Sequence, residues 1–189
     1  MTTRHPSASP TPIRFGSRPT VATGFVKRQG QDELFEAVFA RSQPHTVLTG
    51  MRGSGKTQLA AAVAARCEQE GWPLVAWIHA ASRKHIIADL YEVALRIGID
   101  APKNIPLEVI VQRLLDRLRS AEAADRLFVF DNVENPDDLR DLIPEGVGVR
   151  TLVTTPHHFD WDGLGWLRLT VGAFDREQSV SLLCERTGD

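Results

Sequence analysis

A glycine-rich octapeptide at residues 50–57, GMRGSGKT, constrains this chain more than any other feature of its sequence. It fits the pattern G-x-x-x-x-G-K-[ST], with a short apolar run before it at residues 46–48 and a helix-forming segment after it. Glycines let the backbone curl so that successive N–H groups point into one concavity, and the following helix N-terminus adds a dipole that favours phosphate. The octapeptide therefore predicts a P-loop that binds a purine nucleoside triphosphate or diphosphate with Mg²⁺.

The residue types of the loop predict separate roles. Lys56 is expected to reach the β- and γ-phosphates, and Thr57 to offer its hydroxyl to Mg²⁺. Both are thus cofactor ligands, and Lys56 is also a catalytic candidate. The remaining loop residues expected to contact the nucleotide are Gly50, Arg52, Gly53, Ser54 and Gly55.

A partner acid for the metal follows a second apolar run. Residues 127–130 (LFVF) read as a buried strand, and Asp131 comes directly after them. Because ligands of a parallel sheet gather at the carboxyl ends of its strands, this carboxylate should lie beside the P-loop. There it can hold Mg²⁺, usually through water. The alternative is an aspartate that only caps the loop after a strand.

Hydrolysis also needs a group that orients or deprotonates the attacking water. Many related ATPases place a glutamate directly after the strand aspartate, but here the residue is Asn132, which is a poor base. Glu134 is the substitute candidate, and a solvated loop acid is the alternative interpretation of it. The catalytic candidates are Lys56, Asp131 and Glu134, and the expected turnover is slow.

The rest of the chain alternates between strand and helix patterns, which predicts a sheet covered on both faces. Its strands are short and apolar, without polar alternation, as a doubly covered parallel sheet requires. The prediction is a P-loop NTPase of the α/β class, a three-layer α/β/α sandwich with a mainly parallel five-stranded sheet. Strands are expected at residues 46–48, 74–78, 127–130, 151–154 and 166–171, and helices at 31–41, 56–69, 82–97, 107–118, 136–142 and 176–186.

The N-terminus has a different composition. Residues 1–22 are rich in Pro, Ser and Thr, so we expect a disordered tail followed by one domain at residues 23–189. The formal net charge of −2 gives no basic excess that would indicate nucleic-acid binding. No apolar stretch is long enough to cross a membrane, and a cytoplasmic protein is expected. Cys67 and Cys184 are expected to be small buried hydrophobes, although the sequence leaves a disulfide open.

Two sets of polar residues lie at the end of the strand expected at residues 151–154 and just after it. If this strand neighbours the P-loop strand, the hydroxyls of Thr154 and Thr155 face the γ-phosphate and can report its loss. β-propensity and a loop hydroxyl explain them equally well. His157, His158 and Asp160 could form a metal site, but a surface loop is favoured because no further ligand has suitable spacing.

Four segments together resemble a known family. They read FVKR at residues 25–28, GMRGSGKTQL at 50–59, FVFDNVENPDDL at 128–139 and RTLVTTPHHFDW at 150–161. This ordered set is similar to the NB-ARC nucleotide-binding domain of STAND-class signal-transduction ATPases. Within that family it most resembles the bacterial, often actinobacterial, members that carry tetratricopeptide repeats.

The resemblance implies a molecular switch in which ADP holds a closed form, and exchange for ATP opens it and drives homo-oligomerisation. It places Val26 and Arg28 against the adenine, and it adds Gln58 to the phosphate and Mg²⁺ contacts of residues 53–57. It also makes Asp131 the Walker B acid, and it assigns the sensor segment to residues 154–155.

Three departures from the family pattern matter. Lys27 stands in place of the usual glycine of the adenine segment, and Pro156 in place of an arginine that reads the γ-phosphate. Sensing by this strand would then need His157 or Arg150. The helical, winged-helix and repeat domains of such regulators are also missing before Asp189. A truncated domain of a longer protein is therefore expected, with those domains as its partners.

Two other functions remain open. One is a small-molecule or nucleoside kinase, a class that usually has an arginine-rich lid. Arg113, Arg117 and Arg119 lie on or near a helix whose apolar stripe should face the core, so a lid is not expected. The other is a structural nucleotide-binding module without turnover.

Overall fold

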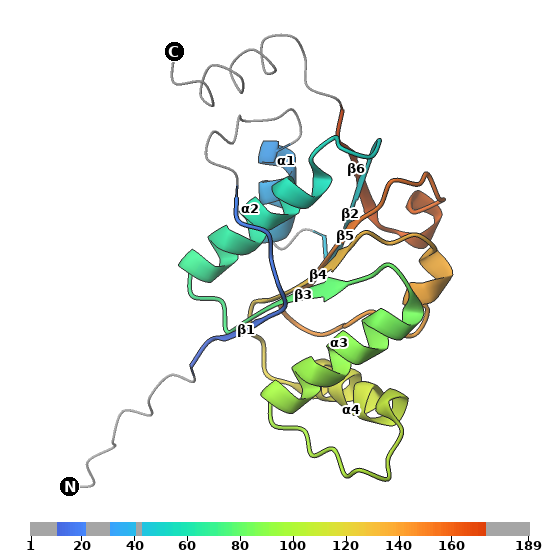
Figure 1. Cartoon of the computed structure of the whole chain (residues 1–189). Helices are drawn as coiled ribbons and strands as arrows, with labels where there is room; N and C mark the ends of the chain where they lie inside the picture. The colour runs from blue at the N-terminus through green and yellow to red at the C-terminus, as the bar shows by residue number, and fades with distance from the viewer. Residues whose placement is uncertain (1–10, 22–30, 41–42, 173–189) are drawn as a thin grey trace, which may run out of the picture.

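The computed structural model describes residues 11–21, 31–40 and 43–172 of the chain. Its centre is a six-stranded sheet in the order β1-β3-β4-β5-β2-β6, in which all neighbouring strands run parallel (Figure 1). The strands are β1 (Ile13–Phe15), β2 (His45–Thr49), β3 (Leu74–His79), β4 (Arg126–Asp131), β5 (Val149–Thr154) and β6 (Leu167–Thr170). The helices are α1 (Gln31–Phe39), α2 (Lys56–Gln69), α3 (Arg83–Arg96) and α4 (Leu107–Ser120), with short 3₁₀ turns η1 (Pro136–Leu139) and η2 (Asp162–Leu164).

Helices cover both faces of this sheet, α1 and α2 on one side and α3 and α4 on the other (Figure 1). Consecutive strand residues point to opposite faces, so Leu152 packs in the core under α1 and α2 while Val153 packs in the core under α3 and α4. This is why the strands show continuous apolar runs. The predicted α/β/α sandwich and P-loop NTPase fold are confirmed.

Strand register brings three distant segments to one edge of the sheet. Leu48 lies opposite Thr154 on the neighbouring strand β5, and Phe130 lies opposite Val153. The P-loop that follows β2, Asp131 at the end of β4 and Thr154 at the end of β5 therefore meet at the carboxyl edge, where parallel α/β sheets bind ligands.

The prediction of a disordered tail at residues 1–22 is wrong for part of that range, because residues 13–15 form β1 at the edge of the sheet. The sheet therefore has six strands rather than the five predicted. β1 pairs with β3, and the Arg96 guanidinium lies 5.3 Å from the ring centroid of Phe15. Three strand residues are too few to create a pattern that sequence analysis can separate from a Pro- and Ser-rich context. Residues 1–10 lie outside the described part.

The remaining predictions concern two helices, the cysteines and the membrane. The segment predicted as a helix at 136–142 is only the η1 turn, and Asp141 then takes a left-handed φ of 61°. The helix predicted at 176–186 and Cys184 lie outside the described residues. Cys67 lies on α2 and is fully buried, as predicted, and burial raises the pKa of its thiol. Within the described ranges, no helix has both the length and the apolar content needed to cross a membrane.

We predict that Gly16→Ala will destabilise the fold, because it disturbs the packing of β1 on β3. Gly16 has φ +84°, and a Cβ there would lie 2.0 Å from the Trp77 carbonyl oxygen. Gly98 has φ +79° with nothing within 4 Å, so Gly98→Ala has the same backbone cost without the clash. Urea unfolding should show Gly16→Ala to be less stable than Gly98→Ala by about 1–3 kcal/mol, the cost of overpacking. Equal stabilities would mean that β1 does not pack on β3.

Candidate nucleotide-binding site

The P-loop adopts a backbone that needs its glycines. Gly50, Gly53 and Gly55 have φ values of 140°, 79° and 87°, which side chains rarely allow. A Cβ on Gly50 would also lie 2.3 Å from the carbonyl oxygen of Val171. Gly55 is the N-cap of α2, so the N–H groups of the first helical turn, which have no acceptor within the helix, face the loop. This arrangement has the backbone geometry that a phosphate-binding loop at a helix N-terminus requires.

Lys56 is the buried cation of the loop, with 8% of its surface exposed. Its Nζ donates hydrogen bonds of 2.8 Å to the carbonyl oxygens of Gly50 and Met51, which keeps the ammonium group inside the curl of the loop. Burial lowers the pKa of Lys56 below its usual value; the Asp131 carboxylate opposes this shift and Arg52 adds to it. The loop therefore holds a positive charge where phosphate oxygens would enter.

Asp131 connects three elements at the carboxyl edge. Its Oδ1 accepts a hydrogen bond of 2.9 Å from the Thr57 hydroxyl of α2 and one of 2.6 Å from the Thr154 hydroxyl of β5. Thr154 in turn accepts from the backbone N–H of Asn132, which has a left-handed φ of 64°. Hydroxyl and carboxylate oxygens are ligands that suit Mg²⁺. Thr57 and Asp131 therefore lie together, as two ligands of one Mg²⁺ ion would need to.

Glu134 lies close to the P-loop but is fully engaged by neighbours. It accepts hydrogen bonds from Arg52 at 3.2 Å and from Asn132 at 3.0 Å, and it contacts His157 Nε2 at 2.9 Å. The bond with His157 lowers the pKa of Glu134, as do Asn132 and Arg52, while partial burial opposes the shift. A carboxylate with a lowered pKa is a weaker general base at neutral pH.

The residues that follow β5 form a loop. Thr155 is fully buried, and its hydroxyl accepts a hydrogen bond from the backbone N–H of His157. Asp160 accepts from the backbone N–H of Gly163, and His158 is exposed, so these residues form a surface loop. Among the described residues, no group of three or more His, Cys, Asp or Glu side chains could hold a metal ion.

The suggestion that Arg150 reads the γ-phosphate is wrong. It lies near the start of β5, four residues before Thr154, or about 13 Å along an extended strand. Its Nη1 donates to the carbonyl oxygen of Val149. Of the two stand-ins considered for the missing arginine, only His157 lies at the carboxyl edge, through its contact with Glu134. Val26 and Arg28, assigned to the adenine, lie outside the described residues.

A cavity of about 640 Å³ adjoins Asp131 on the side away from β5. Its lining includes Phe15, Trp77, His79 and Asp89, together with Asp131. His79 ends β3 directly opposite Asp131, and the backbone N–H of His79 donates 2.8 Å to Asp89 Oδ2. Sequence analysis missed His79 and Asp89. The signal for His79 was present, since it is a polar residue that ends an apolar strand, as Asp131 does.

Comparisons with known proteins support the fold but no family. No family model and no curated protein matches the sequence. The structure is similar to that of Cdc6p from Pyrobaculum aerophilum (TM-score 0.66, 15% identity, 91% of this chain and 52% of that one). It is also similar to a Walker-type ATPase of Pyrococcus abyssi (0.51, 15%, 90% and 61%) and to AMPPCP-bound DnaA from Aquifex aeolicus (0.51, 15%, 87% and 53%). The chain thus spans between half and three-fifths of the length of these proteins, and at this identity the likeness shows the fold alone.

Proposed function

We propose that this chain is the ATP- and ADP-binding regulatory switch domain of a STAND-type signal-transduction ATPase, with slow Mg²⁺-dependent hydrolysis. The observation that carries the proposal is the array of Thr57, Asp131 and Thr154, joined by hydrogen bonds of 2.9 and 2.6 Å beside the P-loop. Lys56 and the first turn of α2 would bind the phosphates. The two oxygen ligands Thr57 and Asp131 would hold Mg²⁺, which neutralises charge between the β- and γ-phosphates.

The residues around the proposed Mg²⁺ ligands support slow turnover. Asn132 follows Asp131, and an amide cannot accept the proton of an attacking water. Glu134 contacts Arg52 of the P-loop and His157 of the segment after β5, so it bridges two elements that a γ-phosphate would touch. A site of this kind distinguishes ATP from ADP more readily than it hydrolyses ATP. Further domains of a longer chain and nucleotide-dependent homo-oligomers are the proposed partners.

The direct test starts from the nucleotide that the purified chain retains. We expect bound ADP, identified by chromatography after denaturation, and slow loss of added ATP that requires Mg²⁺. The absence of any nucleotide binding, measured by calorimetry with ATP and ADP, would refute the proposal. Fast turnover would refute the switch while leaving the nucleotide site in place.

Glu134→Gln should separate catalysis from binding. If Glu134 orients or deprotonates water, ATP hydrolysis should fall about tenfold or more, toward the lower end of what a general base contributes. ADP affinity should change by less than about twofold, because this side chain adds no phosphate ligand. Glu92→Gln on the exposed side of α3 is the matched control. An unchanged rate would show that Glu134 is only a loop acid.

A phosphotransferase is the second candidate, and the cavity beside Asp131 favours it. An acceptor bound there would contact His79 and would lie next to the γ-phosphate end of the nucleotide. Adding a panel of hydroxyl-bearing metabolites to the chain with γ-labelled ATP distinguishes the two functions. Label transferred to an acceptor, with faster ATP loss, supports the kinase. Release of all label as phosphate supports the switch.

A further inference from the structure

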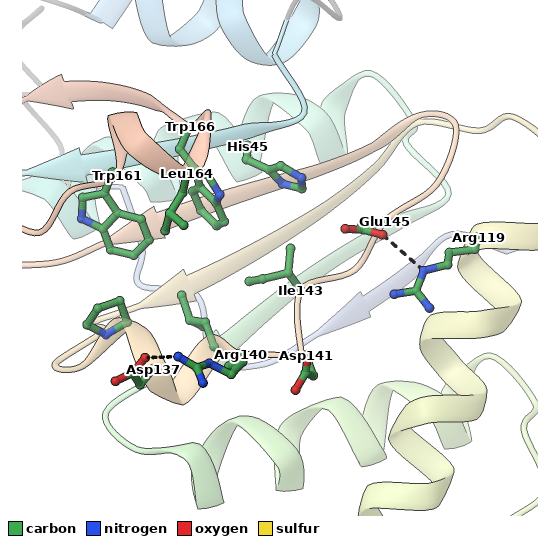
Figure 2. A pocket seen from close by; sticks show the side chains of 12 residues that line it. His45, Arg119, Asp137, Arg140, Asp141, Ile143, Glu145, Trp161, Leu164 and Trp166 are labelled. Carbon is green, nitrogen blue, oxygen red and sulfur yellow. Dashed lines mark hydrogen bonds and ion pairs between the residues drawn. The ribbon is translucent and has the colours of Figure 1, made fainter.

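A second cavity, of about 490 Å³, lies at the opposite end of β2 from the P-loop (Figure 2). It opens on the sheet face that carries α3 and α4, and its volume falls within the range of about 300–1,000 Å³ typical of small-molecule sites. His45 begins β2 and Trp166 precedes β6, and both line it. No residue of the proposed nucleotide site contributes to this cavity.

One side of the cavity is aromatic and apolar. Figure 2 shows His45, Trp161, Leu164 and Trp166 together on this side. The rings of His45 and Trp166 are stacked with centroids 4.9 Å apart, and the Trp161 ring is 5.2 Å from that of Trp166. Leu164 is 65% exposed and adds apolar surface to this side. Such a surface favours a ligand with a flat apolar body.

The other side is charged, with an excess of one carboxylate. Arg119 pairs with Glu145 at 3.2 Å, and Arg140 pairs with Asp137 at 3.1 Å, as Figure 2 shows. The carboxylate of the remaining acid, Asp141, makes no ion pair or hydrogen bond within the described part of the chain. Burial lowers the pKa of His45, with Glu145 opposing the shift, which disfavours a positive charge on this imidazole. The cavity therefore favours a cationic group.

We propose that this cavity binds a small organic molecule with an aromatic ring and a protonated amine. The ring would lie against Trp166 and His45, and the ammonium group would lie toward Asp141. An anion would meet the excess negative charge, and a neutral apolar molecule would gain nothing from the exposed Asp141 carboxylate. The proposal is independent of nucleotide binding.

The test uses three probes of one shape on the full chain, namely 2-phenylethylamine, 2-phenylethanol and 3-phenylpropionate. We expect calorimetry to show that the amine binds about tenfold or more tightly than the alcohol, with the anion weakest. Asp141→Asn should reduce the affinity for the amine to that for the alcohol and leave the alcohol unchanged. Asparagine tolerates the left-handed φ of 61° at this position, so the backbone is retained. Glu108→Gln, which removes a charge outside the cavity, should change neither affinity.

The place of binding is read from the indole N–H signals in an amide correlation NMR spectrum. The amine should shift the signals of Trp161 and Trp166, while Trp72 and Trp77, which belong to the core on the opposite face of the sheet, should stay in place. Equal binding of amine and alcohol, preference for the anion, or no binding up to about 10 mM would overturn the proposal. So would an amine affinity that Asp141→Asn leaves intact.

Discussion

Lys56→Ala is expected to weaken the binding of both ATP and ADP by about 100-fold or more, since charge-assisted hydrogen bonds to phosphate are among the strongest polar contacts. Lys56 is the one buried lysine among the described residues, and its Nζ already lies within the loop, bonded to the carbonyl oxygens of Gly50 and Met51. Alanine removes the charge that phosphate oxygens would meet. The N–H groups of the first turn of α2 remain, so weak residual binding is expected.

Calorimetry with ATP and with ADP, each in the presence of Mg²⁺, measures this effect. Lys103→Ala is the matched control, because Lys103 is exposed in the loop before α4. Thermal unfolding of both variants checks that the fold is retained. If Lys56→Ala binds nucleotide within about threefold of the original chain, the assignment of the P-loop is wrong.

Asp131→Asn should remove the dependence of the site on Mg²⁺. Asparagine has nearly the same shape, and its Oδ1 can still accept the hydrogen bonds from Thr57 and Thr154. What it lacks is the negative charge that attracts a divalent cation. The gain in ATP affinity on adding Mg²⁺ should disappear, and hydrolysis should fall by about 100-fold or more, because the metal supplies several kcal/mol of charge stabilisation.

A Mg²⁺ titration at fixed ATP concentration, followed by hydrolysis rate and by calorimetry, tests this expectation. Asp100→Asn, an exposed carboxylate in the loop between α3 and α4, is the control and should leave the titration unchanged. A midpoint in Asp131→Asn equal to that of the original chain would exclude Asp131 as a metal ligand. The array with Thr57 and Thr154 would then be a structural hydrogen-bond network.

Local chemistry explains why the fold was predictable. The P-loop is a contiguous segment that fits one sequence pattern, and the apolar strands around it reflect burial on both faces of a parallel sheet. The same reasoning placed Asp131 beside the loop, because parallel strands end at the same edge. The comparison structures agree with this fold, whereas the similarity to the NB-ARC domain stays a hypothesis.

Long-range pairing explains what was missed. β1 is held by backbone pairing with β3, and nothing within its three residues distinguishes it from the residues around it. The contact between Glu134 and His157 joins residues 23 positions apart, so sequence spacing could not place the two together. His79 and Asp131 likewise become neighbours only through the register of β3 and β4.

The glycine-rich loop, the α/β class and the strand aspartate could be predicted from the residues alone, because each depends on local backbone preferences and on the burial of short apolar runs. The three-dimensional fold was needed to show which groups that aspartate contacts, that Glu134 contacts Arg52 and His157, and that Arg150 lies at the other end of its strand. It also formed the two cavities beside Asp131 and beside Trp166. Strand order and register are set by packing between segments far apart in the chain, and they fix which side chains lie at the same edge of the sheet.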